Sequence, residues 1–274
     1  MAIHSFLKAE KGDPDWQFTP DSYLGKEFKI IDANTIEIDE GKNDQVILRQ
    51  NPTEKSLLAK HLKVNLQKNS SLELLILNEV DVKIQQVFLY DIHLKDNASL
   101  SLGVFAKNGM LNKHIFQVIL DDNVNFVTYG ITANTVGGDT EIITKIIHQG
   151  EHAKNRQFFL GLSGKESQTV YQNINVVEPG GTCSEIDTES LNLILDEGGR
   201  CHSKQENWIN AEYVKTAQRT ETSYVDLEKI SYLQSKGLSE KQAREAIVSG
   251  FKNIVLNLVG QESLCQEIKE MYAY

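Results

Sequence analysis

Three segments in the middle of the chain repeat one pattern, and this repeat constrains the fold more than any other feature. They are VNLQKNSSLELLI (64–76), IHLKDNASLSLGV (92–104) and VILDDNVNFVTYG (118–130). Each reads as a strand, a polar turn and a second strand. The central residues Asn69, Asn97 and Asn123 lie 28 and 26 residues apart. Asparagine suits such turns because it tolerates a left-handed backbone.

The flanking strands alternate apolar and polar residues, as in Val64 and Leu66 before the first turn and Leu72 and Leu74 after it. This two-residue period is typical of half-buried strands. One such unit cannot bury its own apolar face, whereas a stack of units can. The repeat therefore predicts a mainly β protein, either a β-helix or a layered sandwich. Segments 158–177 and 191–214 continue the repeat with a drifting spacing.

Composition excludes several classes of function. The formal net charge of −10 and the isoelectric point near 5.2 argue against a broad surface for nucleic acid or anionic membrane. No apolar run is long enough to span a bilayer and the first residues lack a secretory signal, so we expect a cytoplasmic protein. Three cysteines without a CxxC spacing indicate neither a disulfide framework nor a structural zinc site.

Two segments flank the repeats. Residues 1–55 are polar and are predicted to form an N-terminal arm or cap, since the exposed strands at the end of a solenoid need covering. Residues 56–222 are predicted to form the β-helix core, and residues 223–274 a small helical domain.

The end of the chain predicts two helices. In the first, Asp226 is a suitable N-cap, Leu227, Ile230 and Leu233 recur at helical spacing, and Gly237 follows the last turn. Ser239 to Gln242 then form a capping box, which starts a second, amphipathic helix. Its apolar residues include Ala243, Ala246, Ile247, Phe251, Ile254, Val255 and Leu258. Gly250 interrupts this pattern.

Three interpretations of the helix pair remain. The helices can simply cap the solenoid, or they can bind a partner. A DNA-binding helix-turn-helix is the weakest interpretation, because the chain is acidic and the second helix carries few basic residues.

The stretch YLQSKGLSEKQAREAIVSGF (232–251) resembles the terminal pattern of the SufB/SufD family of iron–sulfur cluster assembly proteins. TVYQNINVV (169–177), SLNLIL (190–195) and NAEYVK (210–215) occur in the order of that family's last solenoid turns. The resemblance implies a right-handed parallel β-helix core with a C-terminal helical domain. The chain is shorter than many members, which carry a helical N-terminal region.

The resemblance also implies partners. In this family the terminal helices dock the SufC ATPase, an ABC-type subunit, and two β-helices pair edge to edge. We therefore expect a SufD-like, non-catalytic subunit with a SufC-like ATPase and a SufB-like chain, or a second copy of itself, as partners. No intrinsic cofactor is expected, although the complex would hold a transient iron–sulfur cluster. The residues expected to shape or support ATPase docking are Tyr232, Leu233, Lys236, Gly237, Ala243, Ile247 and Phe251.

At one position the chain departs from the family pattern. Family members carry a histidine shortly before the first terminal helix, where this chain has Gln218. An amide is a poor ligand for iron or zinc compared with imidazole.

The remaining candidates for metal ligands are weak. They are Cys183, Cys201 and His202, with Cys183 and Cys201 about one solenoid turn apart, which would allow them to stack. The adjacent Cys201 and His202 would point to opposite faces of a strand, so we favour a buried structural cysteine beside a surface histidine. His148 and His152 have the i, i+4 spacing of helical zinc sites but fall in a region of strand and turn, so we expect both to be solvated.

No enzyme signature is present. GLSGKES (161–167) lacks the first glycine and the final Ser/Thr of a phosphate-binding loop and is predicted to be a turn. The alternative to a scaffold subunit is a stand-alone β-helix that binds polysaccharide through Tyr129, Tyr171, Trp208 and Tyr213, or a divergent homodimeric paralogue that no longer handles clusters.

Overall fold

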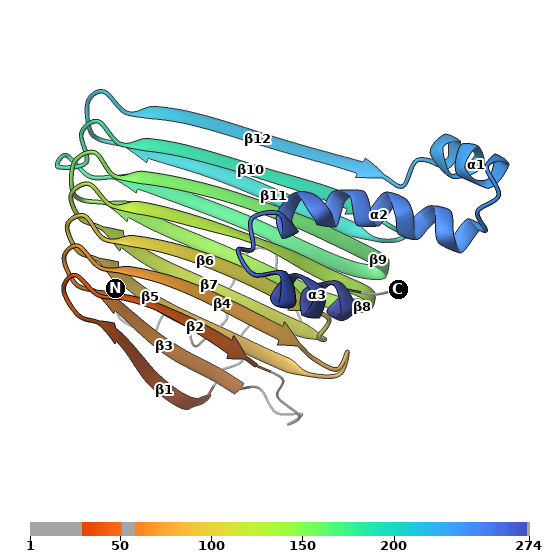
Figure 1. Ribbon diagram of the computed structural model, residues 1–274, viewed down its shortest axis with the longest axis horizontal. Coiled ribbons are helices and arrows are strands. Elements are labelled where there is room, and N and C mark those ends of the chain that lie inside the picture. The colour runs from red at the N-terminus through yellow and green to blue at the C-terminus, as the bar shows by residue number, and fades with distance from the viewer. Residues whose placement is uncertain (1–28, 51–57, 273–274) are drawn as a thin grey trace.

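The computed structural model describes residues 29–50 and 58–272, which form twelve strands and three helices (Figure 1). The strands are β1 (Lys29–Ile38), β2 (Asn43–Arg49), β3 (Leu58–Leu66), β4 (Ser71–Glu79), β5 (Gln85–Leu94), β6 (Ser99–Lys107), β7 (Leu111–Leu120), β8 (Asn125–His148), β9 (Lys154–Val177), β10 (Glu185–Ile194), β11 (Arg200–Ile209) and β12 (Lys215–Tyr224). The helices are α1 (Leu227–Ser235), α2 (Glu240–Leu256) and α3 (Glu262–Met271).

The strands wind into a parallel β-solenoid of about 7 turns, here called coils, with two faces. Face A consists of β1, β3, β5, β7, the second halves of β8 and β9, and β11. Face B consists of β2, β4, β6, the first halves of β8 and β9, β10 and β12. The predicted mainly β solenoid with helices at its C-terminal end is confirmed.

The asparagine turns form one corner of the solenoid. Asn69, Asn97 and Asn123 have left-handed φ angles of 58°, 59° and 55°, as predicted. In the other coils the same corner position is held by Gly41, His152, Cys183 and Tyr213, which also have positive φ. Because histidine, cysteine and tyrosine are poor indicators of a left-handed turn, the repeat is easy to read only in its middle coils.

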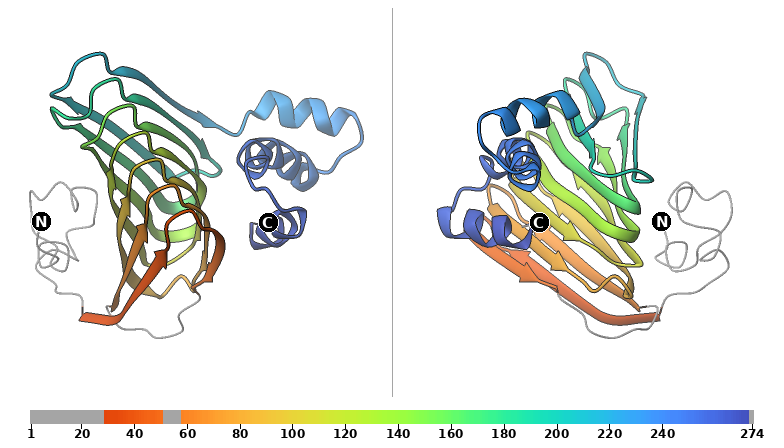
Figure 2. Two further views of the ribbon diagram at one scale, coloured as in Figure 1. Left: turned by 60° about the vertical axis from the view of Figure 1, so that its left-hand side comes forward. Right: turned by 90° about the vertical axis from the view of Figure 1, so that its right-hand side faces the viewer.

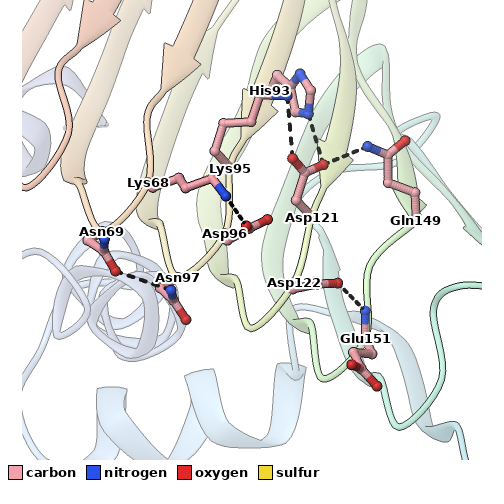
Figure 3. A network of polar contacts seen from close by, with 10 residues as sticks. All are labelled: Lys68, Asn69, His93, Lys95, Asp96, Asn97, Asp121, Asp122, Gln149 and Glu151. Carbon is pink, nitrogen blue, oxygen red and sulfur yellow. Dashed lines mark hydrogen bonds and ion pairs between the residues drawn. The ribbon is translucent and has the colours of Figure 1, made fainter.

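Polar side chains connect neighbouring coils along this corner (Figure 3). The Lys68 ammonium lies 2.6 Å from the Asp96 carboxylate and lowers the pKa of that carboxyl. One coil further on, Asp121 accepts from Gln149 at 2.6 Å and pairs with His93 at 2.9 Å. The corner is thus held by side-chain contacts between coils as well as by the backbone ladder.

The interior changes character along the solenoid. Between β3 and β7 it is filled mainly by Leu, Val, Ile and aromatic side chains, and the ring of Tyr90 stacks on Phe116 at 4.3 Å. One buried polar cluster there joins Asn78, Gln86, Asn112 and His114. Toward the last coils polar side chains bond across the interior instead. Gln157 on face B accepts hydrogen bonds from Thr144 and Tyr171 on face A, both at 2.9 Å.

A second apolar cluster lies outside the solenoid, between face B and the helices. Face B contributes Leu75, Leu77, Phe105, Ile131, Leu160 and Leu193 among others, and the helices contribute Val248, Val255, Leu264 and Ile268 among others. Figure 2 shows the three helices on one side of the solenoid. Residues of α2 and α3 pack against the outer surface of face B. The helices therefore complete a core of their own against the outer surface of face B.

The predicted domain boundaries need three adjustments. Strands β1 and β2 pair in parallel with β3 and β4, so residues 29–49 begin the solenoid instead of forming a separate arm, while residues 1–28 of the predicted arm lie outside the described residues. The last strand ends at Tyr224, just beyond the predicted boundary at 222. The third helix, α3, was not predicted because only the first two helices carry clear capping signals.

Among the helices of the described residues, none has the length and apolar content that a membrane span requires.

Candidate functional site

The predicted capping residues lie at the ends of the first two helices. The Asp226 carboxylate accepts from the backbone N–H of Glu228 at 2.9 Å and caps α1, and Gly237 follows α1 with a φ of 97°. At the start of α2, Ser239 and Gln242 form both hydrogen bonds of a capping box. Helix α2 continues through Gly250, so the predicted interruption is absent.

Helix α2 is packed on face B. Ala243 is fully buried, and Val248, Val255 and Leu256 lie on the same covered side. Lys252 is also buried, and its ammonium donates to the carbonyl of Tyr272 at 2.9 Å, while burial lowers the pKa of Lys252. Lys252 thus connects α2 to the C-terminal end of α3 by a buried hydrogen bond.

Helix α3 is anchored at several points of the solenoid. The Tyr272 hydroxyl donates to the backbone carbonyl of Ile131 at 2.7 Å, and Lys107 donates to the carbonyl of Met271. Arg49 on β2 makes a two-point ion pair with Glu267, with both N–O distances at 2.8 Å. The α2–α3 unit is therefore a fixed platform that reaches from the last coils to the first.

Helix α1 covers only the first half of the apolar stripe of α2. Ile230 and Leu233 of α1 pack against the cluster that holds Ala243, Ile247 and Phe251 of α2. The stripe continues at helical spacing to Ile254, and Leu258 follows just after the end of α2; each is 47% exposed.

A hollow of about 560 Å³ opens where β12, α1 and α2 meet. Its lining includes Tyr224, Leu227, Ile247 and Phe251. Leu227 is 68% exposed and Tyr224 is also largely exposed. We define the docking surface as Tyr224 and Leu227, which line this hollow, together with the exposed Ile254 and Leu258, which follow Phe251 along the chain.

The seven residues expected at an ATPase-docking surface divide into three groups. Tyr232, Lys236 and Gly237 are exposed, and the Lys236 ammonium lies 5.4 Å from the centre of the Tyr232 ring. Leu233, Ile247 and Phe251 are half-buried, and Ala243 is internal. The sequence had suggested Leu227 only as a helix-packing residue, so its exposure was missed. Helical spacing cannot show how far a neighbouring helix extends.

The last coil forms the second feature of interest. Within the described residues β12 pairs only with β10, and β11 pairs only with β9, so both strands have an open edge. Gln218, expected to stand at the position of the family histidine, lies on β12 in register with Thr188 of β10. The departure from the family pattern is therefore located at the open end of the solenoid.

The cysteines do not form a pair. Cys183 occupies the corner between β9 and β10, where its N–H bonds to the carbonyl of Glu212. Cys201 lies on β11 opposite Thr169, whose hydroxyl donates to the Cys201 sulfur at 3.3 Å, and burial raises the pKa of Cys201. The predicted stacking of Cys183 on Cys201 is wrong, because the residue one coil before Cys201 is Thr169, 32 positions earlier, whereas Cys183 is only 18 positions earlier.

The histidine candidates are also dispersed. His202 is adjacent to Cys201 and half-buried, and burial lowers its pKa. His148 is fully buried inside the solenoid, where burial lowers its pKa to about 4, so its predicted exposure to solvent is wrong. His152 is exposed at the corner, as expected. No three His, Cys, Asp or Glu side chains within the described part of the chain are grouped to hold a metal ion.

Two further expectations are corrected by the strand arrangement. GLSGKES is part of the continuous strand β9, in which only Glu166 has a positive φ, so the predicted turn is a bend within a strand. Tyr129 and Tyr171 are buried, whereas Trp208 and Tyr213 are exposed. These four aromatic residues therefore do not form one exposed row for a polysaccharide.

Comparison with known proteins agrees with this architecture. A family profile described as SUF system FeS cluster assembly, SufBD core domain, matches residues 23–251. The chain is 25% identical over 145 residues to the iron–sulfur cluster assembly protein SufD of Bacillus subtilis, which covers 52% of this chain and 33% of that protein. It is 24% identical over 143 residues to the chloroplastic iron–sulfur cluster assembly SufBD family protein ABCI8 of Arabidopsis thaliana, which covers 52% of this chain and 25% of that protein.

The matched stretch thus spans a quarter to a third of the length of these two relatives. The family profile covers all the described strands, α1 and helix α2 as far as Phe251, so it includes the open end of the solenoid and Tyr224 and Leu227 of the docking surface. The chain therefore belongs to the SufBD core domain family of the SUF system for iron–sulfur cluster assembly.

Proposed function

We propose that this chain is a SufD-like, non-catalytic scaffold subunit of a cytoplasmic iron–sulfur cluster assembly complex. In this proposal the docking surface binds a SufC-like ABC-type ATPase, and the open end of the solenoid pairs with a SufB-like chain or with a second copy. The cluster is transient cargo of the complex, and the chain has no resident cofactor.

The observation that carries the proposal is the exposed apolar surface on a fixed support. Leu227 leaves apolar area uncovered at a hollow, and Ile254 and Leu258 are exposed near the C-terminal end of α2. Tyr272 and the Arg49–Glu267 pair hold the helices to the solenoid. Apolar residues that surround a hollow are typical of a protein interface. Because the α2–α3 unit is fixed to the solenoid, a conformational change of a bound ATPase would be transmitted to the solenoid.

The replacement of histidine by Gln218 favours a supporting role in cluster assembly. An amide oxygen binds iron more weakly than imidazole does, so this chain would contribute structure and a partner would supply the ligands at the end of the solenoid. The polysaccharide-binding alternative has no surface to support it, since two of its four aromatic residues are buried.

The test is a binding titration between the purified chain and a SufC-like ATPase from the same organism. Leu227→Glu and Ile254→Glu should each weaken binding by about 30-fold, the effect of an interface residue worth roughly 2 kcal/mol. Val136→Glu is the matched control, because Val136 is an exposed apolar residue outside the docking surface, at the bend in the middle of β8. Undiminished binding by the folded Leu227 and Ile254 variants would remove the docking claim.

Tyr232→Glu provides a separate test of the predicted surface on the opposite side of α1. Tyr232 is 60% exposed and points away from the side that carries the buried Ile230. If this variant loses as much affinity as Leu227→Glu, the ATPase surrounds α1, and the contact is broader than the docking surface.

A further inference from the structure

The outer surface of face A carries a buried patch in the middle coils. Along these strands the side chains of Phe88, Phe116 and Ile142 point into the solenoid, so those of the residues beside them point outward. Eight outward side chains lie in register across four strands as two adjoining rows, yet each is exposed by 4% or less. We call them the face A patch: Val87, Leu89, Lys113, Ile115, Glu141, Ile143, Val170 and Gln172.

The patch includes a buried ion pair. The Lys113 ammonium lies 2.7 Å from the Glu141 carboxylate, and both side chains are inaccessible to solvent. Asp139, two residues before Glu141, is also buried, and burial raises its pKa to about 7. Charged side chains on the outside of a sheet normally reach water, because burying them costs free energy. The burial of these groups therefore indicates that another segment of polypeptide covers the patch.

The helices of the described part of the chain do not supply this cover. They lie on the other side of the solenoid and pack against the outer surface of face B (Figure 2). Outward residues that border the patch are more accessible, since Lys63 is exposed and Lys145 and His202 are half-buried. The cover is thus local to the middle coils. Because these exposures are those of a single chain, the cover belongs to the chain itself.

The segment between β2 and β3 is a poor candidate for the cover. Its sequence, NPTEKSL (51–57), has only seven residues and one large apolar side chain, and its two ends are held by the strands that it joins. It cannot supply apolar contacts to two rows of side chains on four strands.

Residues 1–28 have the length and the composition that the patch requires. They directly precede β1, which belongs to face A. The farthest strand of the patch, β9, lies five strand positions from β1, which is about 24 Å at about 4.8 Å per strand. An extended chain of 28 residues reaches about 90 Å. The segment also contains five aromatic residues: Phe6, Trp16, Phe18, Tyr23 and Phe28.

We propose that residues 1–28 form an arm that crosses the outer surface of face A and covers the face A patch. In this proposal the predicted arm protects one face of the solenoid instead of its open end. The N-terminal arm covers face A as the C-terminal helices cover face B, so neither apolar sheet surface is left to associate with other proteins. The inference goes beyond ATPase docking, which concerns the opposite side of the solenoid.

Tryptophan fluorescence tests the inference in the full chain. The chain has two tryptophans, and Trp208 is 58% exposed, so Trp208→Phe leaves Trp16 of the arm as the only one. Its emission should be shifted to the blue and weakly quenched by acrylamide. Ile143→Lys in the same background places a charge in the patch and should raise the quenching to that of a free peptide of residues 1–28. Val136→Lys, at the exposed bend of the same strand, is the matched control and should leave the quenching unchanged.

Three results would overturn the inference. One is free quenching of Trp16 in the Trp208→Phe chain, and another is quenching that Ile143→Lys leaves unchanged. The third is shielding that appears only at high protein concentration, which would identify a second copy as the cover. If circular dichroism shows that Ile143→Lys does not fold, Ile143→Thr should raise the quenching by a smaller amount, and no rise would also exclude the arm. ATPase binding by each variant is measured in parallel and should not change.

Discussion

The first and last coils of this solenoid have the same backbone but different interiors: the first coils are mainly apolar, with one polar cluster at Asn78, Gln86, Asn112 and His114, whereas the last coils are largely polar. In the coils built from β3 to β7, Leu74, Leu102 and Phe116 are fully buried among other apolar side chains. In the coils built from β9 to β12, Asn155 donates to Asn175 at 2.7 Å and Asn192 donates to Ser203 at 2.9 Å across the interior. The backbone ladder therefore tolerates either kind of interior, and the side chains decide how stable each half is.

The difference between the two interiors implies a difference in stability between the two halves of the solenoid. Apolar interiors gain free energy from burial, whereas a hydrogen-bonded interior gains little net free energy and loses much when one partner is removed. Within the described residues the last coils even leave the side-chain oxygen of Asn155 and the hydroxyl of Ser184 without a protein partner. We interpret the first coils as the stable foundation and the last coils as the part that remains open for pairing.

The strongest way to break this comparison is to remove apolar volume from the first coils. Phe116→Ala should lower the free energy of unfolding by about 3–5 kcal/mol, because it deletes a buried ring stacked on Tyr90 and leaves a cavity. Urea denaturation followed by circular dichroism measures the loss. The first coils would not be the more stable half if Phe116→Ala lowered the free energy of unfolding by less than the truncation of a polar side chain in the last coils does.

Acid should weaken both halves through buried histidines. Burial lowers the pKa of His114 to about 3 and that of His148 to about 4, from an ordinary 6.5. The unfolded chain binds these protons below about pH 6.5 while the folded chain does not, so each histidine removes about 1.4 kcal/mol of stability per pH unit until its own pKa is reached.

Asp139 acts in the opposite direction, because burial and the nearby Glu141 raise its pKa to about 7, so its contribution to stability falls as the pH rises from about 4 to 7. His114→Gln should therefore flatten the loss of stability between pH 6 and 4, which unfolding titrations at several pH values would detect. An unchanged slope would show that His114 is protonated in the folded chain.

A smaller effect is expected from the polar interior. Asn175 donates to Asn173 at 2.6 Å and to Asn207 at 2.8 Å, so Asn175→Ala leaves several buried polar groups without partners. We expect a loss of about 1–3 kcal/mol in the free energy of unfolding. Asn125→Ala, at an exposed position of β8, is the matched control and should change stability by less than about 0.5 kcal/mol.

The smallest effect concerns the corner. His152 has a left-handed φ of 58°, which costs a residue with a Cβ atom about 1 kcal/mol or more, so His152→Gly should raise stability by roughly 0.5 kcal/mol. Asn97→Gly should not, because Asn97 donates to Asn69 at 3.1 Å along the corner. If His152→Gly and Asn97→Gly raised the thermal unfolding temperature by the same amount, histidine and asparagine would contribute equally to stability at this corner.

Much of the local structure could be predicted. The asparagine corners, the cap at Asp226 and the capping box at Ser239 depend on residues within a few positions of one another, and all are confirmed. The errors concern residues whose surroundings come from distant segments. His148 was expected to be solvated in a region of strand and turn but lies buried inside the solenoid, and α3, which has no side-chain cap, is held to face B by Tyr272 and Arg49.

The sequence by itself determined that the chain stacks β units and ends in capped helices, since period, turn residues and caps act over short distances along the chain. Only the tertiary structure decided which side of α2 remains exposed, where Cys183 and Cys201 lie, and how Gln205 comes to bond to the carbonyl of Arg219 across the interior. These relations depend on the number of residues in each coil and on which face the helices cover. Both arise when segments far apart in sequence pack together.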